Sequence, residues 1–195
     1  MIPRCGIAFC LCLLSLSSAA HAEGLTVSLE AGSERTAADF SKALLNYDIV
    51  SLTKDAGNGL SWTLQVQNYR ARTSGAVSWA GEGLVTYRRA MGENTSLYAS
   101  LGGGERFAPT RDFPYLTVRL GADDTLGSGF TWNALNLRYR TGFDQRYPYH
   151  STTAGTGLTY RTDRDVAIYG RVFAAFDTGY RFAGTGVGLG LRFFL

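Results

Sequence analysis

The last ten residues constrain the fold most, because large apolar side chains alternate there with positions that are mostly glycine. The apolar positions are Val187, Leu189, Leu191, Phe193 and Leu195. The positions between them are Gly186, Gly188, Gly190, Arg192 and Phe194. A repeat of two residues is the period of a β-strand, so one face of this segment is bulky and the other is almost bare. The chain therefore ends in a strand with one strongly apolar face.

The same period recurs upstream and predicts an all-β fold of about ten strands. The predicted strands are 24–32, 43–54, 59–70, 76–89, 95–102, 114–122, 128–141, 152–161, 166–176 and 186–195. Short connections are predicted at 55–59, 90–95, 123–127 and 162–165, and the others, mostly longer, at 33–42, 71–75, 103–113, 142–151 and 177–185. Because short and long connections alternate, we expect neighbouring antiparallel strands in an up-and-down order.

The segment 43–54 has the weakest alternation. Its pattern predicts an outward face made of Leu45, Tyr47 and Ile49, with Asp48 on the inner face, but Val50 and Leu52 interrupt it. A fold of eight strands is therefore the alternative to ten.

The first 22 residues have the pattern of a secretory signal peptide. Arg4 precedes an apolar run, and Ala20-His21-Ala22 is a small-x-small cleavage site. We expect cleavage after Ala22, which leaves 23–195 as one domain. The three cysteines, at 5, 10 and 12, all lie in the leader, so no disulfide and no thiolate site are expected in the mature chain.

A terminal strand of this kind, behind such a leader, resembles the C-terminal strand of Gram-negative outer-membrane β-barrel proteins. That family usually ends in Phe, whereas here Phe193 and Phe194 precede Leu195. The resemblance implies an up-and-down antiparallel transmembrane β-barrel with short periplasmic turns and longer outer loops. It also implies a location in the outer membrane, contact with its lipid and lipopolysaccharide, and insertion by the barrel-assembly machinery. A lipocalin-like secreted barrel, apolar inside instead of outside, is the rival fold.

Charge and hydropathy exclude two other classes of protein. Arg4 is the only charged residue of the predicted leader, so 18 basic and 16 acidic side chains remain after cleavage. This balance does not favour nucleic-acid binding. No apolar run of about 18 residues follows the leader, so no transmembrane helix is expected.

A group of charged residues has the parity of the inner face and forms the candidate site. It comprises Glu30, Asp48, Glu82, Arg88, Arg119, Arg138, Arg140, Arg161, Arg171 and Arg192. Charges inside a narrow barrel must pair or reach water, so one interpretation is a salt-bridged plug. The other uses the excess of seven arginines over three carboxylates and predicts a lumen that favours anions. In either case Glu82, midway along its strand, is expected to pair with Arg119, Arg138 or Arg171.

Residues for catalysis are scarce. The single histidine of the predicted mature chain is His150, beside Ser151 and near Asp144. Adjacent residues of an extended chain point to opposite faces, so His150 and Ser151 do not readily form a base–nucleophile pair. No group of His, Cys or carboxylate residues has the spacing of metal ligands, and no cofactor is expected.

The function that the sequence favours is that of a non-enzymatic outer-membrane barrel whose surface loops contact lipopolysaccharide or a partner. The first alternative is a narrow channel for anions or sugars. The second alternative is a lipid A-modifying or proteolytic enzyme centred on His150.

Overall fold

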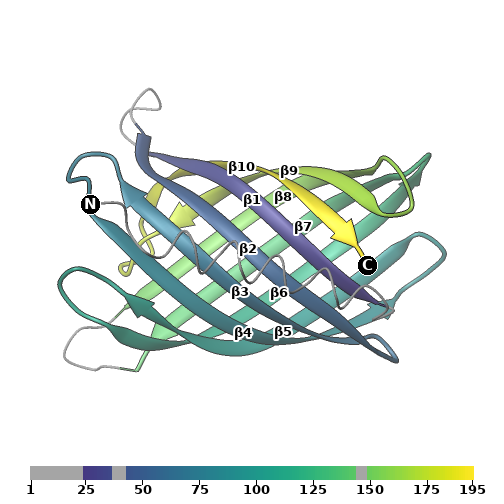
Figure 1. The fold of residues 1–195 in the computed structure, drawn as a ribbon, viewed down its shortest axis with the longest axis horizontal. Helices are drawn as coiled ribbons and strands as arrows, with labels where there is room; N and C mark the ends of the chain where they lie inside the picture. Colours follow the sequence, from purple (N-terminus) through teal and green to yellow (C-terminus); the bar gives the residue numbers. More distant parts are fainter. Residues whose placement is uncertain (1–23, 37–42, 144–148) are drawn as a thin grey trace.

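The computed structural model describes residues 24–36, 43–143 and 149–195, and it shows a closed barrel of tilted antiparallel strands (Figure 1). The ten strands are β1 (Leu25–Thr36), β2 (Ala43–Gly57), β3 (Leu60–Ala71), β4 (Val77–Ala90), β5 (Thr95–Phe107), β6 (Phe113–Gly127), β7 (Phe130–Gly142), β8 (His150–Arg161), β9 (Val166–Phe176) and β10 (Phe182–Phe194). Each strand pairs with its neighbours in sequence, and β1 pairs with β10 to close the ring. The prediction of an up-and-down all-β barrel of about ten strands is confirmed, and the alternative of eight strands is wrong.

Six of the ten strands are longer than the sequence pattern predicts, and most of the connections beside them are shorter. β5 continues to Phe107, β6 to Gly127, and β10 begins at Phe182. Two connections at the end of the barrel that carries the C-terminus are tight hairpins, in which Asn58 and Ser128 adopt positive φ angles between glycines. Such angles give the two-residue turns that match strand twist. We call this end the terminal end and the opposite one the loop end (Figure 1).

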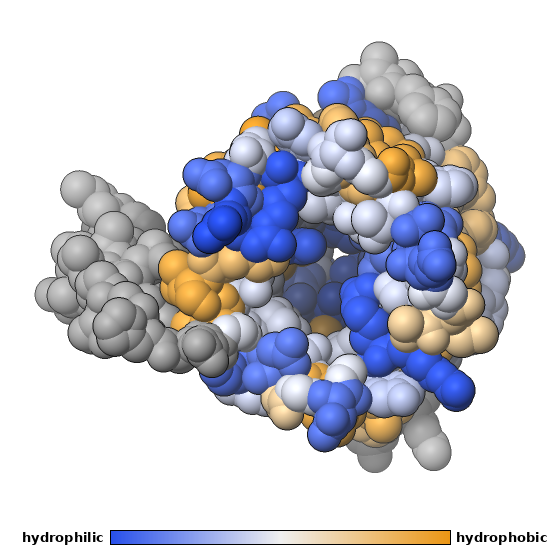
Figure 2. All heavy atoms as spheres, turned by 90° about the vertical axis from the view of Figure 1, so that its right-hand side faces the viewer, coloured by the Kyte–Doolittle hydropathy of each residue, from blue (hydrophilic) through white to orange (hydrophobic). Residues whose placement is uncertain are grey.

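The wall has a polar inner face and an apolar outer face. On the outside, Leu189 is 72% exposed and Leu64 55% exposed, whereas Gln67 and Thr117 on the inside are fully buried. Figure 2 shows hydrophobic residues on the flanks of the barrel around a hydrophilic interior. This sidedness is that of a membrane barrel and is the reverse of a lipocalin-like fold. Within the described ranges, no helix is long and apolar enough to span a membrane.

The glycines of β10 make room for aromatic rings in the lumen. A Cβ atom at Gly186 would lie 2.1 Å from Cζ of Phe173, and one at Gly190 would lie 2.4 Å from Cζ of Tyr169. A Cβ atom at Gly188 would lie 2.6 Å from the hydroxyl oxygen of Tyr47. The glycine face of the last strand, which is evident in the sequence, therefore packs against three aromatic rings from β2 and β9.

The predicted orientation of β2 is wrong. Tyr47 lies inside, 3% exposed, where its hydroxyl donates to the carbonyl oxygen of Val187 at 3.2 Å. Ile49 lines the central cavity, and Asp48 is exposed on the outer wall, paired in register with Ala31 and Asn68. The reason is steric: the bare surface over glycines 32 and 188 accepts the Tyr47 ring, which reverses the face of every neighbouring residue.

Candidate functional site

The lumen contains a polar cavity of about 240 Å³. Five arginines line it, namely Arg88, Arg119, Arg138, Arg171 and Arg192, together with the carboxylates Glu30 and Asp123. Figure 2 looks onto the terminal end and shows a hollow bordered by hydrophilic residues. The cavity therefore carries more positive than negative side chains.

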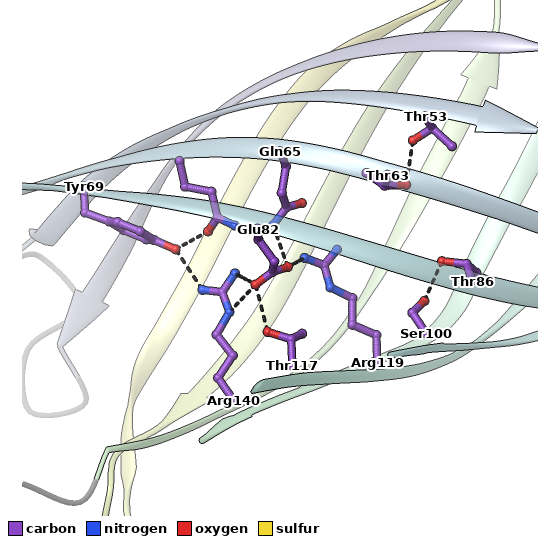
Figure 3. Close-up of polar contacts among 11 residues, drawn as sticks. Thr53, Thr63, Gln65, Tyr69, Glu82, Thr86, Ser100, Thr117, Arg119 and Arg140 are labelled. Atoms are coloured by element: carbon purple, nitrogen blue, oxygen red, sulfur yellow. Dashed lines mark hydrogen bonds and ion pairs between the residues drawn. The ribbon is translucent and has the colours of Figure 1, made fainter. Parts of the chain in front are cut away.

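Glu82 of β4 is the centre of a cluster of hydrogen bonds and ion pairs on one wall (Figure 3). Its side chain is fully buried, and the carboxylate accepts hydrogen bonds from Gln65 Nε2 on β3 and Thr117 Oγ1 on β6, both at 2.8 Å. It forms ion pairs with Arg119, and with Arg140 at 2.6 Å from the Nη2 atom. A buried charge with this many partners holds its surroundings in one arrangement.

The Glu82 cluster extends across the lumen through Arg140. The Nη1 atom of Arg140, on β7, donates to the Tyr69 hydroxyl of β3 at 3.1 Å, and that hydroxyl donates to Gln67 (Figure 3). The Arg140 guanidinium also lies 5.0 Å from the ring centroid of Tyr115. Because β3 and β7 are four strands apart, these contacts fill part of the cross-section and narrow the passage.

A second cluster lies on the wall formed by β9, β10 and β1. Glu30 accepts from Arg171 Nε at 2.8 Å and from the Tyr169 hydroxyl at 3.1 Å. The Arg171 guanidinium also lies 5.1 Å from the ring centroid of Phe173 and 5.8 Å from that of Tyr47. These rings pack against the β10 glycines. The glycines of β10 therefore make room for the rings that contact the Arg171 guanidinium.

A third group of contacts lies toward the terminal end. Asp123 pairs with Arg88 and accepts from Asn133 Nδ2 at 2.7 Å. Arg192 lies 5.2 Å above the Tyr169 ring, and Arg161 lies 4.4 Å above the Phe194 ring. A contact with an aromatic ring does not cancel the charge of an arginine, so Arg192, which borders the cavity, contributes positive charge to the lumen.

Arginines outnumber carboxylates on the inner face. Among the described residues, the strand registers place eight arginines inside, which are Arg88, Arg106, Arg119, Arg138, Arg140, Arg161, Arg171 and Arg192. They place five carboxylates there, which are Glu30, Glu34, Asp55, Glu82 and Asp123. Arg138 borders the cavity without an ion-pair partner in this part of the chain, and its buried Nε atom has no hydrogen-bond partner.

The structure places nine of the ten charged residues selected from the sequence on the inner face, and Asp48 on the outer face. It pairs Glu82 with Arg119, as one of the expected partners, and with Arg140, but not with Arg138 or Arg171. Four inner charged residues are not among those selected from the sequence, namely Glu34, Asp55, Arg106 and Asp123. They had been assigned to connections, although continuing the two-residue period past the predicted strand ends would have found them.

His150 lies on the outer wall near the loop end, away from the lumen. Its Nδ1 atom is 2.9 Å from the Tyr139 hydroxyl, which is 3.4 Å from the Tyr180 hydroxyl. Ser151 is paired in register with the inward Arg140 and so has the opposite orientation, while Asp144 lies outside the described residues. No group of three or more possible metal ligands occurs in the described part of the chain.

No protein-family model matches this sequence, and no curated protein matches it. Solved structures do match its fold. The NanC porin is 10% identical, with 87% of this chain and 100% of that one covered and a TM-score of 0.57. An outer-membrane channel from Pseudomonas putida F1 is 9% identical, with 88% and 94% covered and a TM-score of 0.54. The closed ten-strand barrel, its apolar outer wall and these likenesses together place the chain in the general class of outer-membrane β-barrels.

Proposed function

We propose that the protein is a narrow channel that favours small anionic solutes over cations. The observation that carries this proposal is the cavity, which is lined by five arginines and two carboxylates. A pore wall with an excess of one charge raises the local concentration of ions of the opposite sign. The two similar structures are a porin and a channel by name, which is compatible with the proposal.

The clusters described above set the width of the passage. Glu82 and Arg140 occupy one side and Glu30 with Arg171 the other, while Arg138 lines the space that remains. Folded solutes and large oligomers do not fit a cavity of about 240 Å³. The substrate class is therefore small anions, and the terminal end would face the periplasm.

Conductance in planar bilayers tests the proposal. In a gradient of potassium chloride, the reversal potential should show a preference for chloride, and Arg138→Gln should reduce that preference. Arg89→Gln is the matched control. This substitution removes the same charge from the outer wall, where Arg89 pairs in register with Leu97. A barrel that is correctly folded yet conducts no ions, or prefers potassium, would refute the channel.

Contact with lipopolysaccharide is the second candidate function. The cluster of Tyr139, His150 and Tyr180 favours it, because amphipathic rings on the outer wall near the loop end are typical of membrane interfaces. If this contact is specific, lipopolysaccharide should raise the unfolding temperature of the wild type more than that of a His150→Ala, Tyr180→Ala variant. Equal shifts would refute it.

A further inference from the structure

Two arginines lie directly opposite each other in the wall of the cavity. Arg119 of β6 and Arg138 of β7 are partners in the strand register, and both border the cavity. Like charges in directly opposite positions of neighbouring strands repel each other, so each arginine of this pair needs an anion beside it. For Arg119 that anion is Glu82, with which it forms an ion pair (Figure 3).

Arg138 is the arginine of the lumen that lacks such a partner. Among the described residues it forms no ion pair, hydrogen bond or contact with an aromatic ring, whereas each of the other seven inward arginines forms at least one. The Nε atoms of Arg138 and Arg119 are also buried without a hydrogen-bond acceptor. A buried donor on a charged group is costly without an acceptor, and a bound anion can supply one.

The wall beside this pair leaves room for a ligand. On β8, Thr153 is the register partner of Arg138, and the next inward residue toward the terminal end is Gly155. Both border the cavity. Gly155 and Gly157 have no side chains, so Arg171 of β9 borders the same cavity from the far side of β8. A compact anion next to Arg138 therefore has space and further cationic side chains in the same cavity.

The charges around this space do not cancel. The Glu82 and Glu30 clusters contain three arginines against two carboxylates, and Arg138 adds a fourth guanidinium, which leaves an excess of two positive charges. Glu34, an inward carboxylate nearer the loop end, does not border the cavity and forms no ion pair among the described residues. A dianion neutralises the excess, whereas chloride neutralises only half of it.

We propose that Arg119 and Arg138 form the binding site for the phosphate group of a small solute in the lumen. A phosphate dianion presents several oxygens in a compact group, so it can accept hydrogen bonds from both guanidinium groups at once. The cavity of about 240 Å³ admits this group with a small organic substituent. The inference rests on the proposed function in one respect, because the solute must enter the lumen, and it names the solute that the channel favours.

Isothermal titration calorimetry on the purified, folded barrel tests the site. Inorganic phosphate should bind saturably, and Arg138→Gln should raise the dissociation constant about tenfold or more, since a hydrogen bond to a charged group is lost. Arg138 has no hydrogen bond or ion pair to lose among the described residues, so this variant should fold like the wild type.

Arg192→Gln is the matched control for this titration. It removes the same charge from the same cavity, but at a guanidinium that lies over the Tyr169 ring, three strands from β7. The control should therefore change the dissociation constant much less than Arg138→Gln does.

Two further measurements identify the solute and connect the site to conduction. Glycerol phosphate should also bind: tighter binding than that of inorganic phosphate identifies an organic ester as the solute, and weaker binding identifies the free ion. In planar bilayers, phosphate should reduce the chloride current through the wild type and leave the current through Arg138→Gln unchanged.

The outcomes separate the site from the channel. A barrel that prefers chloride but binds no phosphate refutes the site and leaves the channel in place. A barrel that binds phosphate but carries no current refutes the channel and leaves the site in place. Equal weakening by Arg138→Gln and Arg192→Gln also overturns the proposal, because it shows attraction to the lumen as a whole.

Discussion

Replacing Glu82 with glutamine removes the charge that holds the largest cluster in the lumen together. Glu82→Gln keeps the size and one acceptor, but leaves the guanidinium groups of Arg119 and Arg140 facing a neutral amide. The NH₂ group of the glutamine amide is a hydrogen-bond donor, so it is repelled by the N–H donors of the two arginines. We therefore expect the folded barrel to lose stability while its architecture is retained.

The magnitude follows from the exposure of the two arginines. A buried ion pair broken on one side typically costs about 3–5 kcal/mol. The side chain of Arg140 is 4% exposed and cannot reach water, whereas that of Arg119 is 22% exposed and borders the cavity. Arg119 can turn into the cavity, so the lower end of the range, about 3 kcal/mol, is expected. For a chain of this size, that corresponds to a fall in unfolding temperature of roughly 6–12 °C.

The assay is the temperature at which the folded form disappears on semi-native gels. Glu105→Gln is the control, because Glu105 is exposed on the outer wall of β5 and has no partner among the described residues, so the same change there should not lower this temperature. Adding Arg140→Met to Glu82→Gln should recover part of the loss, since the stranded charge is removed. If Glu82→Gln unfolds at the wild-type temperature, the cluster is hydrated and the argument for a dry, ordered wall is refuted.

Three further predictions concern the barrel wall. Deleting Phe193–Leu195 should sharply reduce assembly into the outer membrane, because the last strand closes the ring against β1; normal recovery of heat-modifiable protein would contradict this. Arg substitutions at Leu64, Val118 or Leu189 should each lower the free energy of unfolding by about 2–4 kcal/mol in refolding titrations, whereas Leu97→Arg near the terminal end should lower it by about 0–1 kcal/mol. Equal losses would show that these residues do not lie at the expected depths in the membrane. Gly190→Ala should destabilise by about 1–3 kcal/mol, since its Cβ would lie 2.5 Å from the backbone oxygen of Leu29, while Gly92→Ala, with open space around it, should be neutral in thermal unfolding.

Most of the architecture could be predicted from the sequence, because a two-residue period is a local signal. β9 was predicted with the bounds that the structure has, and the other strands differ at one or both ends. The periodic signal fades where a strand carries polar residues on both faces, as around Glu105 and Arg106 of β5. The pattern there resembles a loop, although the ladder continues to Phe107.

The orientation of β2 could not be predicted because it depends on residues far away in the sequence. Tyr47 is large and amphipathic and suits either face of a membrane barrel. Its position is decided by the space over Gly188, which lies about 140 residues later. The choice of Arg140 over Arg138 as a partner of Glu82 has a similar origin, since both residues face inward on the same strand and only the strand registers separate them.

The ring seats on β10 also have a consequence for the order of folding. Phe173 and Tyr169 come from β9, the neighbour of β10 in sequence, so their contacts with the glycines of β10 can form early, within a hairpin of these two strands. Tyr47 comes from the other end of the chain and reaches Gly188 only when β1 and β2 are in place. Contacts of such sequence separation form slowly, because a long loop must close first. Closure of the ring is therefore expected to be the late step, and it is complete only when a side chain from the first hairpin fits the last strand.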